Sequence, residues 1–299
     1  MPRFGEVDAG SHHEGLKRIR CFFIFTCDMG VVMRLFHWLI LPLLATPAIG
    51  GETAWQEVAP GVHLRLVTTG EVRSDGRTLA GIEIDMPEAT KTYWQVPGDT
   101  GLPLEVDLSG STGVTGHQVL WPYPAVERTA DYLDYVYRGH TVIPLVLNVE
   151  AGAAHLSASL VLGICSEICV PAQAKLSLPL RDARPDRANA LRIRQALADV
   201  PMPWPDDQPV FGEPRLVPEH AAVALPVEVE DLEVHSLIAT FEDGVPLLGV
   251  PHYSPDGHLV QIPVLDMGDM DELVGREVRL TFMTSEGAYE THRTIGPPG

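Results

Sequence analysis

The sequence predicts a mainly β protein built from antiparallel β-sandwiches, and three observations support this prediction. Short runs of alternating apolar and polar residues recur along the chain. The 26 prolines and 27 glycines supply frequent turn signals, which favours short strands over long helices. One segment alone has a clearly helical composition. Period-2 strands at such intervals are typical of sheets with one buried and one exposed face.

Each predicted element follows from this pattern. A first sandwich is expected over residues 51–183, with strands at 62–67, 79–86, 117–121, 142–149, 156–162 and 175–180. A helix at 186–198 and a stiff Pro-rich linker at 201–209 make up the segment 184–209. Asp186 is the expected N-cap of the helix, and Leu191, Ile193, Ala196 and Leu197 form its expected apolar stripe. A second, smaller sandwich-like domain is expected over 210–299, with strands near 222–229, 234–241, 258–262 and 277–283.

Residues 1–50 are expected to be a presequence with a signal peptide at 33–50. Arg34 precedes a short apolar run, and the small residues Ala48 and Gly50 follow it, as at a signal-peptidase site. This pattern predicts export to the periplasm. The chain after residue 51 contains no apolar run typical of a membrane span, so we expect no stable membrane insertion after cleavage.

Charge and motifs exclude several functional classes. The formal net charge of −19 disfavours binding to nucleic acid and to anionic lipid. A G-x-S-x-G elbow, a phosphate-binding Gly loop and a dinucleotide fingerprint are all missing from the sequence. A hydrolase or a nucleotide-dependent enzyme is therefore disfavoured, and we expect no organic cofactor.

The cysteines carry the strongest chemical signal. Of four cysteines, Cys21 and Cys27 would leave with the presequence, so Cys165 and Cys169 remain as a C-x3-C pair. A bridge this local would stabilise the fold by only about 2 kcal/mol, which makes stability a weak reason for it. A redox-active pair is the favoured interpretation. A structural disulfide in an inert interaction module and a thiolate site for Cu(I) remain open.

The residues around the pair give little help with its reactivity. No Lys, Arg or His lies in the motif to favour a thiolate, and Glu167 should oppose one. Tyr93, Trp94 and Trp121 are interpreted as core aromatic residues rather than as a ligand platform.

Three segments resemble a known family. Residues 92–103 (Thr-Tyr-Trp-Gln-Val-Pro-Gly-Asp-Thr-Gly-Leu-Pro), residues 119–122 (Val-Leu-Trp-Pro) and residues 163–172 (Gly-Ile-Cys-Ser-Glu-Ile-Cys-Val-Pro-Ala) are similar to the amino-terminal periplasmic domain of DsbD-type thiol:disulfide interchange proteins. The similarity is greatest with the ScsB-like branch, which is linked to copper tolerance. We expect the chain to act without the membrane and thioredoxin parts of full-length relatives, and therefore with separate proteins.

The resemblance implies an immunoglobulin-like fold with a disulfide-exchanging pair at one end. A membrane or thioredoxin-like electron donor would reduce the pair, which would then reduce thioredoxin-like periplasmic oxidoreductases, as a protein-disulfide reductase does. Cys169 would form the mixed disulfide and Cys165 would resolve it. A cap loop shields the pair in relatives, and Tyr132, Asp134 and Tyr135 lie where such a loop is expected.

Overall fold

The computed structural model describes residues 51–180, 185–229, 232–255, 257, 259–265 and 269–298. The predicted presequence and signal peptide, and the boundary at residue 183, lie outside this range. All described residues belong to one compact unit, so the predicted domain limits stay a prediction.

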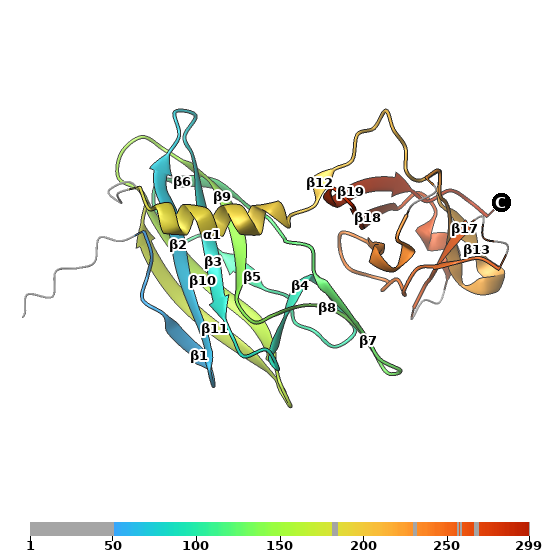
Figure 1. Cartoon of the computed structure of the whole chain (residues 1–299), viewed down its shortest axis with the longest axis horizontal. Coiled ribbons are helices and arrows are strands. Elements are labelled where there is room, and N and C mark those ends of the chain that lie inside the picture. Colours follow the sequence, from blue (N-terminus) through green and yellow to red (C-terminus); the bar gives the residue numbers. More distant parts are fainter. Residues whose placement is uncertain are drawn as a thin grey trace, which may run out of the picture. The chain divides into compact units, whose positions relative to one another are not determined.

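The first β-rich region contains two antiparallel sheets (Figure 1). One sheet has five strands in the order β1 (Gln56–Ala59), β2 (Val62–Val72), β3 (Arg77–Asp85), β9 (Thr141–Val149) and β6 (Val114–Val119). The other has six strands, with the path β11 (Cys169–Pro179), β10 (His155–Cys165), β4 (Lys91–Gly98), β8 (Leu133–Arg138) and β7 (Ala125–Arg128). Its remaining strand, β5 (Glu105–Asp107), pairs with β10.

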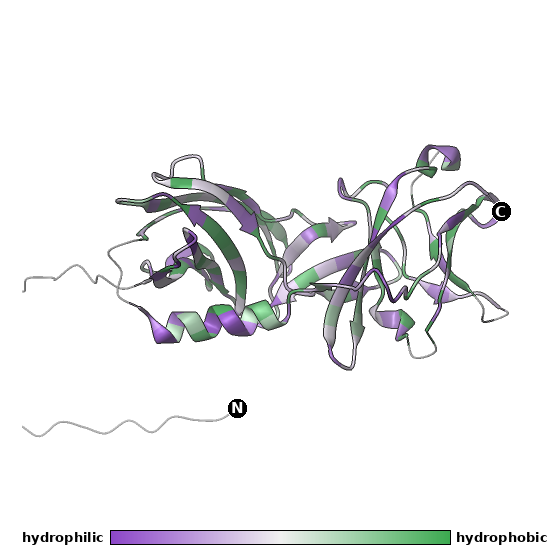
Figure 2. Ribbon diagram, turned by 90° about the horizontal axis from the view of Figure 1, so that it is seen from above, coloured by the Kyte–Doolittle hydropathy of each residue, from purple (hydrophilic) through white to green (hydrophobic). Residues whose placement is uncertain are grey.

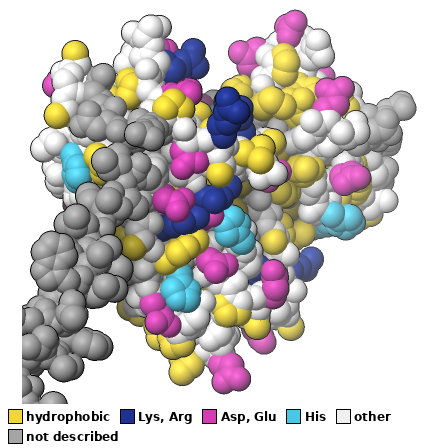
Figure 3. Space-filling view, turned by 60° about the vertical axis from the view of Figure 1, so that its left-hand side comes forward, with side chains coloured by type: hydrophobic (Ala, Val, Ile, Leu, Met, Phe, Trp, Pro, Cys, Tyr) yellow, Lys and Arg dark blue, Asp and Glu magenta, His cyan; other side chains and the backbone are white. Residues whose placement is uncertain are grey.

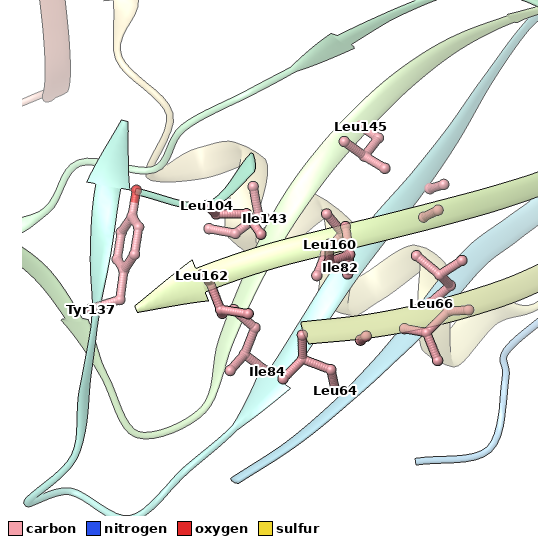
Figure 4. Close-up of a cluster of buried hydrophobic side chains, with 14 of the residues drawn as sticks. Leu64, Leu66, Ile82, Ile84, Leu104, Tyr137, Ile143, Leu145, Leu160 and Leu162 are labelled. Atoms are coloured by element: carbon pink, nitrogen blue, oxygen red, sulfur yellow. The ribbon is translucent and has the colours of Figure 1, made fainter. Parts of the chain in front are cut away.

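The two sheets enclose one apolar core. Figure 4 shows leucine and isoleucine side chains of the five-stranded sheet, such as Leu64 and Ile82, packed beside Leu160 and Leu162 of β10. All four side chains are almost completely buried. Alternate residues of each strand point into this core because strand side chains alternate between faces, and the alternating colours along the strands in Figure 2 follow that period. The predicted sandwich-type, mainly β fold is confirmed.

One α-helix lies among the described residues: α1 (Arg187–Ala198) packs on the five-stranded sheet against β2, β3 and β9. Asp186 is its N-cap, as predicted, and its side chain accepts a hydrogen bond from the backbone N–H of Asn189. The predicted apolar stripe is wrong in part: Ile193 is buried, but Leu191 is 58% exposed. Asn189 is buried instead, and its side-chain amide is satisfied there by donating to the carbonyl of Gly51.

The second β-rich region contains two four-stranded sheets around a separate apolar core. One has the order β12 (Met202–Pro203), β19 (Gly287–Thr294), β18 (Glu277–Thr284) and β15 (Ile238–Thr240). The other has the order β13 (Arg215–Val217), β14 (Ala222–Pro226), β17 (Leu259–Pro263) and β16 (His252–Tyr253). Short 3₁₀ helices lie at Pro218–His220, Val234–Ser236 and Met270–Leu273.

The segment predicted as a stiff linker is partly a strand. Met202 and Pro203 pair in parallel with Tyr289 and Glu290 of β19. Trp204 packs its ring against Phe282 and Tyr289, which anchors the segment to that sheet. A run of prolines can still add an edge strand, since the missing N–H groups need only face away from the ladder.

Surface charges are mixed on the face seen in Figure 3, where acidic, basic and histidine side chains intermingle. Within the described part of the chain, no helix is both long and apolar enough to cross a membrane.

Candidate functional site

Cys165 and Cys169 form a disulfide at the end of a β-hairpin. Cys165 is the last residue of β10 and Cys169 is the first of β11, and the two are directly paired in the ladder. Ser166, Glu167 and Ile168 form the turn between them. The Cα atoms lie 4.1 Å apart, so the register of the hairpin itself brings the sulfur atoms within bonding reach.

The two cysteines differ sharply in exposure. Cys165 is 2% exposed, whereas Cys169 lies at the surface. The apolar side chains next to Cys169 are exposed as well, at 75% for Ile168 and 43% for Val170. A second protein could therefore reach Cys169 but not Cys165.

The disulfide lies on the face of the six-stranded sheet that points away from the core. Residues such as Leu162 and Ile164 of β10 point into the core, and the alternation places Cys165 on the opposite, outer face. There it forms a small buried cluster with Tyr93 of β4 and Val136 of β8.

Tyr93 contacts the disulfide directly. Its phenol oxygen lies 2.8 Å from Sγ of Cys165 and 3.7 Å from Sγ of Cys169. A disulfide sulfur carries no proton, so the phenol must be the donor. Burial raises the pKa of Tyr93 above its ordinary value, although a hydrogen bond with Thr100 acts in the opposite direction. The phenol thus keeps its proton at neutral pH and remains a donor.

A loop between β4 and β5, residues 99–104, covers the Tyr93 ring. A Cβ added to Gly101 would lie 2.2 Å from a Tyr93 ring carbon, and one added to Gly163 would lie 3.2 Å from another. The ring is therefore held between two glycines. The backbone N–H of Gly163 donates to the carbonyl of Leu102 at 3.0 Å, which ties this covering loop to β10.

A buried charge cluster holds the other end of the covering loop. Asp134 is fully buried and accepts hydrogen bonds from Nζ of Lys91 at 2.9 Å, from the Thr100 hydroxyl at 2.6 Å and from the Thr100 N–H at 3.0 Å. Glu127 also accepts from Nζ of Lys91 at 2.9 Å. We call Lys91, Thr100, Glu127 and Asp134 the Asp134 cluster.

The Asp134 cluster is linked to the disulfide through strand pairing. Lys91 is the ladder partner of Cys165, and its ammonium lies 5.6 Å from the centroid of the Tyr93 ring. Burial alone would lower the pKa of Lys91, but its hydrogen bonds to Asp134 and Glu127 outweigh burial and raise that pKa above its ordinary value. In the same way, burial acts to raise the pKa of Glu127, but its bonds with Lys91 and Arg138 hold it below its ordinary value. Both groups therefore stay charged at neutral pH.

These findings change two sequence-based interpretations. Trp94 is a core residue, as predicted, but Tyr93 is buried against the cysteines rather than in the main core. The motif itself holds no cation, yet the sheet register brings Lys91 beside Cys165. Tyr93 and the covering loop lie inside the segment 92–103 that carries the family resemblance, which is the one sequence signal that pointed to them.

The predicted cap residues lie elsewhere than expected. Asp134 and Tyr135 belong to strand β8, so their assignment to a loop is wrong. Strand pairing with β4 and β7 fixes them in the sheet: Asp134 points to the buried charge cluster, and Tyr135 packs into the core. Tyr132 does lie in the turn before β8, with the Lys91 ammonium 4.7 Å from its ring centroid. Its role as a shield stays a prediction.

Among the described residues, no group of three or more His, Cys, Asp or Glu side chains could hold a metal ion. The Cu(I) alternative needs only the two thiolates and stays a prediction.

Comparison with known proteins supports the fold. No protein-family model matches the chain, and no curated protein matches it in sequence. The crystal structure of the N-terminal periplasmic domain of ScsB from Proteus mirabilis superposes with a TM-score of 0.66 at 21% identity, covering 83% of this chain and 99% of that chain. The chain therefore shares the fold of the N-terminal periplasmic domain of ScsB, a DsbD-like protein.

Proposed function

We propose that this protein is a periplasmic thiol–disulfide exchange protein that relays electrons through Cys165 and Cys169. The observation that carries the proposal is the asymmetry of the disulfide. One sulfur is open to another protein, and the other is buried against a phenol donor. A bridge that only stabilised the fold would need neither feature.

Reduction of the pair would begin at Cys169. The thiolate of a donor protein attacks Sγ of Cys169, a new disulfide forms between the two proteins, and the Cys165–Cys169 bond breaks. The electron pair of that bond goes to Cys165, which leaves as a thiolate. A second donor thiolate then attacks the intermolecular disulfide and releases Cys169, so that two electrons have moved from the donor to this protein.

Tyr93 would assist the leaving sulfur. Its O–H already points at Sγ of Cys165, and a hydrogen bond from a neutral donor to an ionised acceptor is stronger than one to a neutral acceptor. The bond therefore strengthens as negative charge develops on Cys165. The covering loop keeps water away from the phenol and fixes its orientation.

Delivery of electrons would reverse these steps. The reduced Cys169 thiolate attacks an oxidised partner, and Cys165 resolves the mixed disulfide, which regenerates the internal bridge. The expected partners are a membrane or thioredoxin-like donor and periplasmic oxidoreductases. Two observations support a periplasmic location: the sequence pattern of residues 33–50 and the shared fold with a periplasmic domain of ScsB.

A redox titration against glutathione tests the proposal. We expect reversible opening and closing of the pair, with a reduction potential above about −300 mV, the range in which disulfides exchange readily. A potential well below about −300 mV would assign the bridge to structure and contradict the proposal.

Partner trapping tests the assigned roles of the two cysteines. The Cys165→Ser variant should accumulate covalent complexes through Cys169, which mass spectrometry can identify. The Cys169→Ser variant is the matched control, because its remaining thiol is buried and should trap nothing. Equal trapping by both variants would contradict the division of roles between the two sulfur atoms.

A further inference from the structure

Strand β11 ends the six-stranded sheet, and Cys169 is its first residue. Among the described strands, β10 is the only one that pairs with β11. The second region has a comparable hairpin, β18–β19, but its second strand is not a sheet edge. β19 pairs with β18 on one side and with β12 on the other. No described strand covers the edge of β11 in this way.

The ladder geometry shows which backbone groups face that open edge. In an antiparallel pair, residues alternate between positions that bond each other and positions whose N–H and C=O point away from the partner strand. The N–H of Gly163 donates to Leu102, and its C=O accepts from the hydroxyl of Thr92, both on the side of β10 away from β11. The Gly163–Pro171 pair is therefore a non-bonded pair.

The Cys165–Cys169 pair lies two residues along the ladder from the Gly163–Pro171 pair. Because bonded and non-bonded pairs alternate, it is a non-bonded pair as well. Cys165 pairs with Lys91 on the other side of β10, which agrees with this assignment. The Cα–Cα distance of 4.1 Å also fits the close spacing of non-bonded pairs, about 4.5 Å. The N–H and C=O of Cys169 consequently point outward, to the open edge.

The prolines of β11 independently support this assignment of which residues face the open edge. Proline in a sheet is confined to positions whose N–H would face away from the ladder. Pro171 and Pro179 both share the parity of Cys169, at opposite ends of β11. They remove outward donors from the edge, which limits pairing by other chains. The outward donor at Cys169 remains.

We propose that the partner protein docks by adding a short extended segment, which carries its reactive cysteine, to the open edge at Cys169. This inference rests on the proposed exchange function and specifies how the partner is recognised. Backbone pairing of this kind is a general mode of peptide recognition, in which main-chain hydrogen bonds supply affinity and side-chain contacts supply selectivity. The Cys169 N–H and C=O would form one pair of such bonds.

The neighbouring side chains favour an apolar occupant. Ile168 and Val170 flank Cys169, and these apolar side chains expose 75% and 43% of their surfaces to solvent. A partner segment with apolar residues next to its cysteine would cover them. Pro171 ends the pairing after one residue pair, so the contact stays short and the partner can leave after exchange.

Rates of disulfide opening test the inference. The oxidised full chain is mixed with a short capped peptide, Thr-Val-Cys-Val-Thr, with capped cysteine alone, and with the same peptide N-methylated at its cysteine. At equal thiolate concentration, the peptide should react about tenfold faster than capped cysteine, and N-methylation should abolish the advantage because it removes the donor that would face the Cys169 carbonyl. The Cys169 amide should also gain hydrogen-exchange protection in the mixed disulfide formed by the Cys165→Ser variant with the peptide.

Two proline variants form a matched pair. Pro171→Thr restores an outward N–H beside the reactive sulfur and should speed the reaction with the peptide about threefold. Pro179→Thr restores one at the far end of β11 and should leave the rate unchanged. If peptide and capped cysteine react equally fast, or if both variants respond equally, edge pairing is wrong while exchange stands. If neither probe opens a disulfide that a strong dithiol can reduce, the proposed exchange function fails instead.

Discussion

The two faces of the six-stranded sheet use the same strands for different purposes. On the inner face, residues of β4, β8 and β10 such as Trp94, Tyr135 and Leu162 pack into a continuous apolar core. On the outer face, the residues between them form a small cluster around Tyr93 and Cys165 and a buried set of charges. A period of two residues thus separates the packing of this domain from its chemistry.

This separation implies that substitutions on the two faces should have different consequences. Inner-face changes should lower stability and leave the sulfur chemistry intact, and outer-face changes should do the reverse. The Asp134 cluster is the expected exception, since Lys91 and Glu127 lie on the outer face and yet their loss should lower stability.

The largest effect is expected for Lys91→Met, which breaks the simple division between faces. Removing the ammonium leaves the fully buried Asp134 carboxylate without its cation. The loss of one partner of a buried pair costs about 3–5 kcal/mol of unfolding free energy. Urea unfolding measures it. A double variant, Lys91→Met with Asp134→Asn, should recover part of the loss, and no recovery would show that the charge pair is not the cause.

Leu162→Ala sharpens the comparison from the inner face. Leu162 is completely buried in the core, and its truncation should cost about 3 kcal/mol through lost burial and a cavity. The rate at which a small thiol opens the disulfide, measured well below the unfolding transition, should stay as in the parent. A rate change comparable to that of outer-face variants would mean that the faces are coupled.

Tyr93→Phe gives the reciprocal test from the outer face. The variant keeps the ring between Gly101 and Gly163 but loses the donor to Sγ of Cys165. Opening of the disulfide by a small thiol should slow about tenfold, since a hydrogen bond to a charged acceptor is worth about 1.5–3 kcal/mol. Tyr137→Phe is the control: it loses a buried hydrogen bond to the carbonyl of Pro122 and should leave the rate unchanged.

The smallest effect concerns acid stability and Glu127. Because its folded-state pKa is lowered, its contribution to stability is present above the ordinary carboxyl range and is lost as the pH falls through the folded value. Glu127→Gln should therefore lower the unfolding free energy by about 1 kcal/mol at pH 7, a modest figure because the side chain is partly exposed. The difference between parent and variant should shrink as the pH falls from about 5 to about 3. A constant difference across this range would argue against the ion pair.

Much of the fold follows from local sequence pattern. The alternating runs predict the strands, and Asp186 marks the start of the helix, because both depend on neighbouring residues alone. The cysteine pair follows from spacing in the same way. Strand pairing between residues far apart in the sequence could not be predicted. Lys91 pairs with Cys165, and Met202 pairs with Tyr289, although long segments of chain separate the members of each pair.

The environment of the cysteines shows the same limit. Tyr93 and Trp94 are adjacent aromatic residues with equal burial, and only the placement of β4 decides that one faces the core and the other the disulfide. Most of the covering loop belongs to the segment 92–103 that resembles a known family, so the sequence marks it as notable. Its contact with the Tyr93 ring, however, depends on the absence of a Cβ at Gly101. Such a contact becomes evident only in three dimensions.

The short turn between the cysteines has a consequence for repeated use. The hydrogen-bonded ladder of β10 and β11 already holds Cys165 and Cys169 opposite each other. The ring that their disulfide closes is also small. Opening it releases little chain entropy and leaves the hairpin in place. Reduction should therefore lower the melting temperature by only a few degrees, and under the proposed exchange function the pair could open and close repeatedly without partial unfolding of the hairpin.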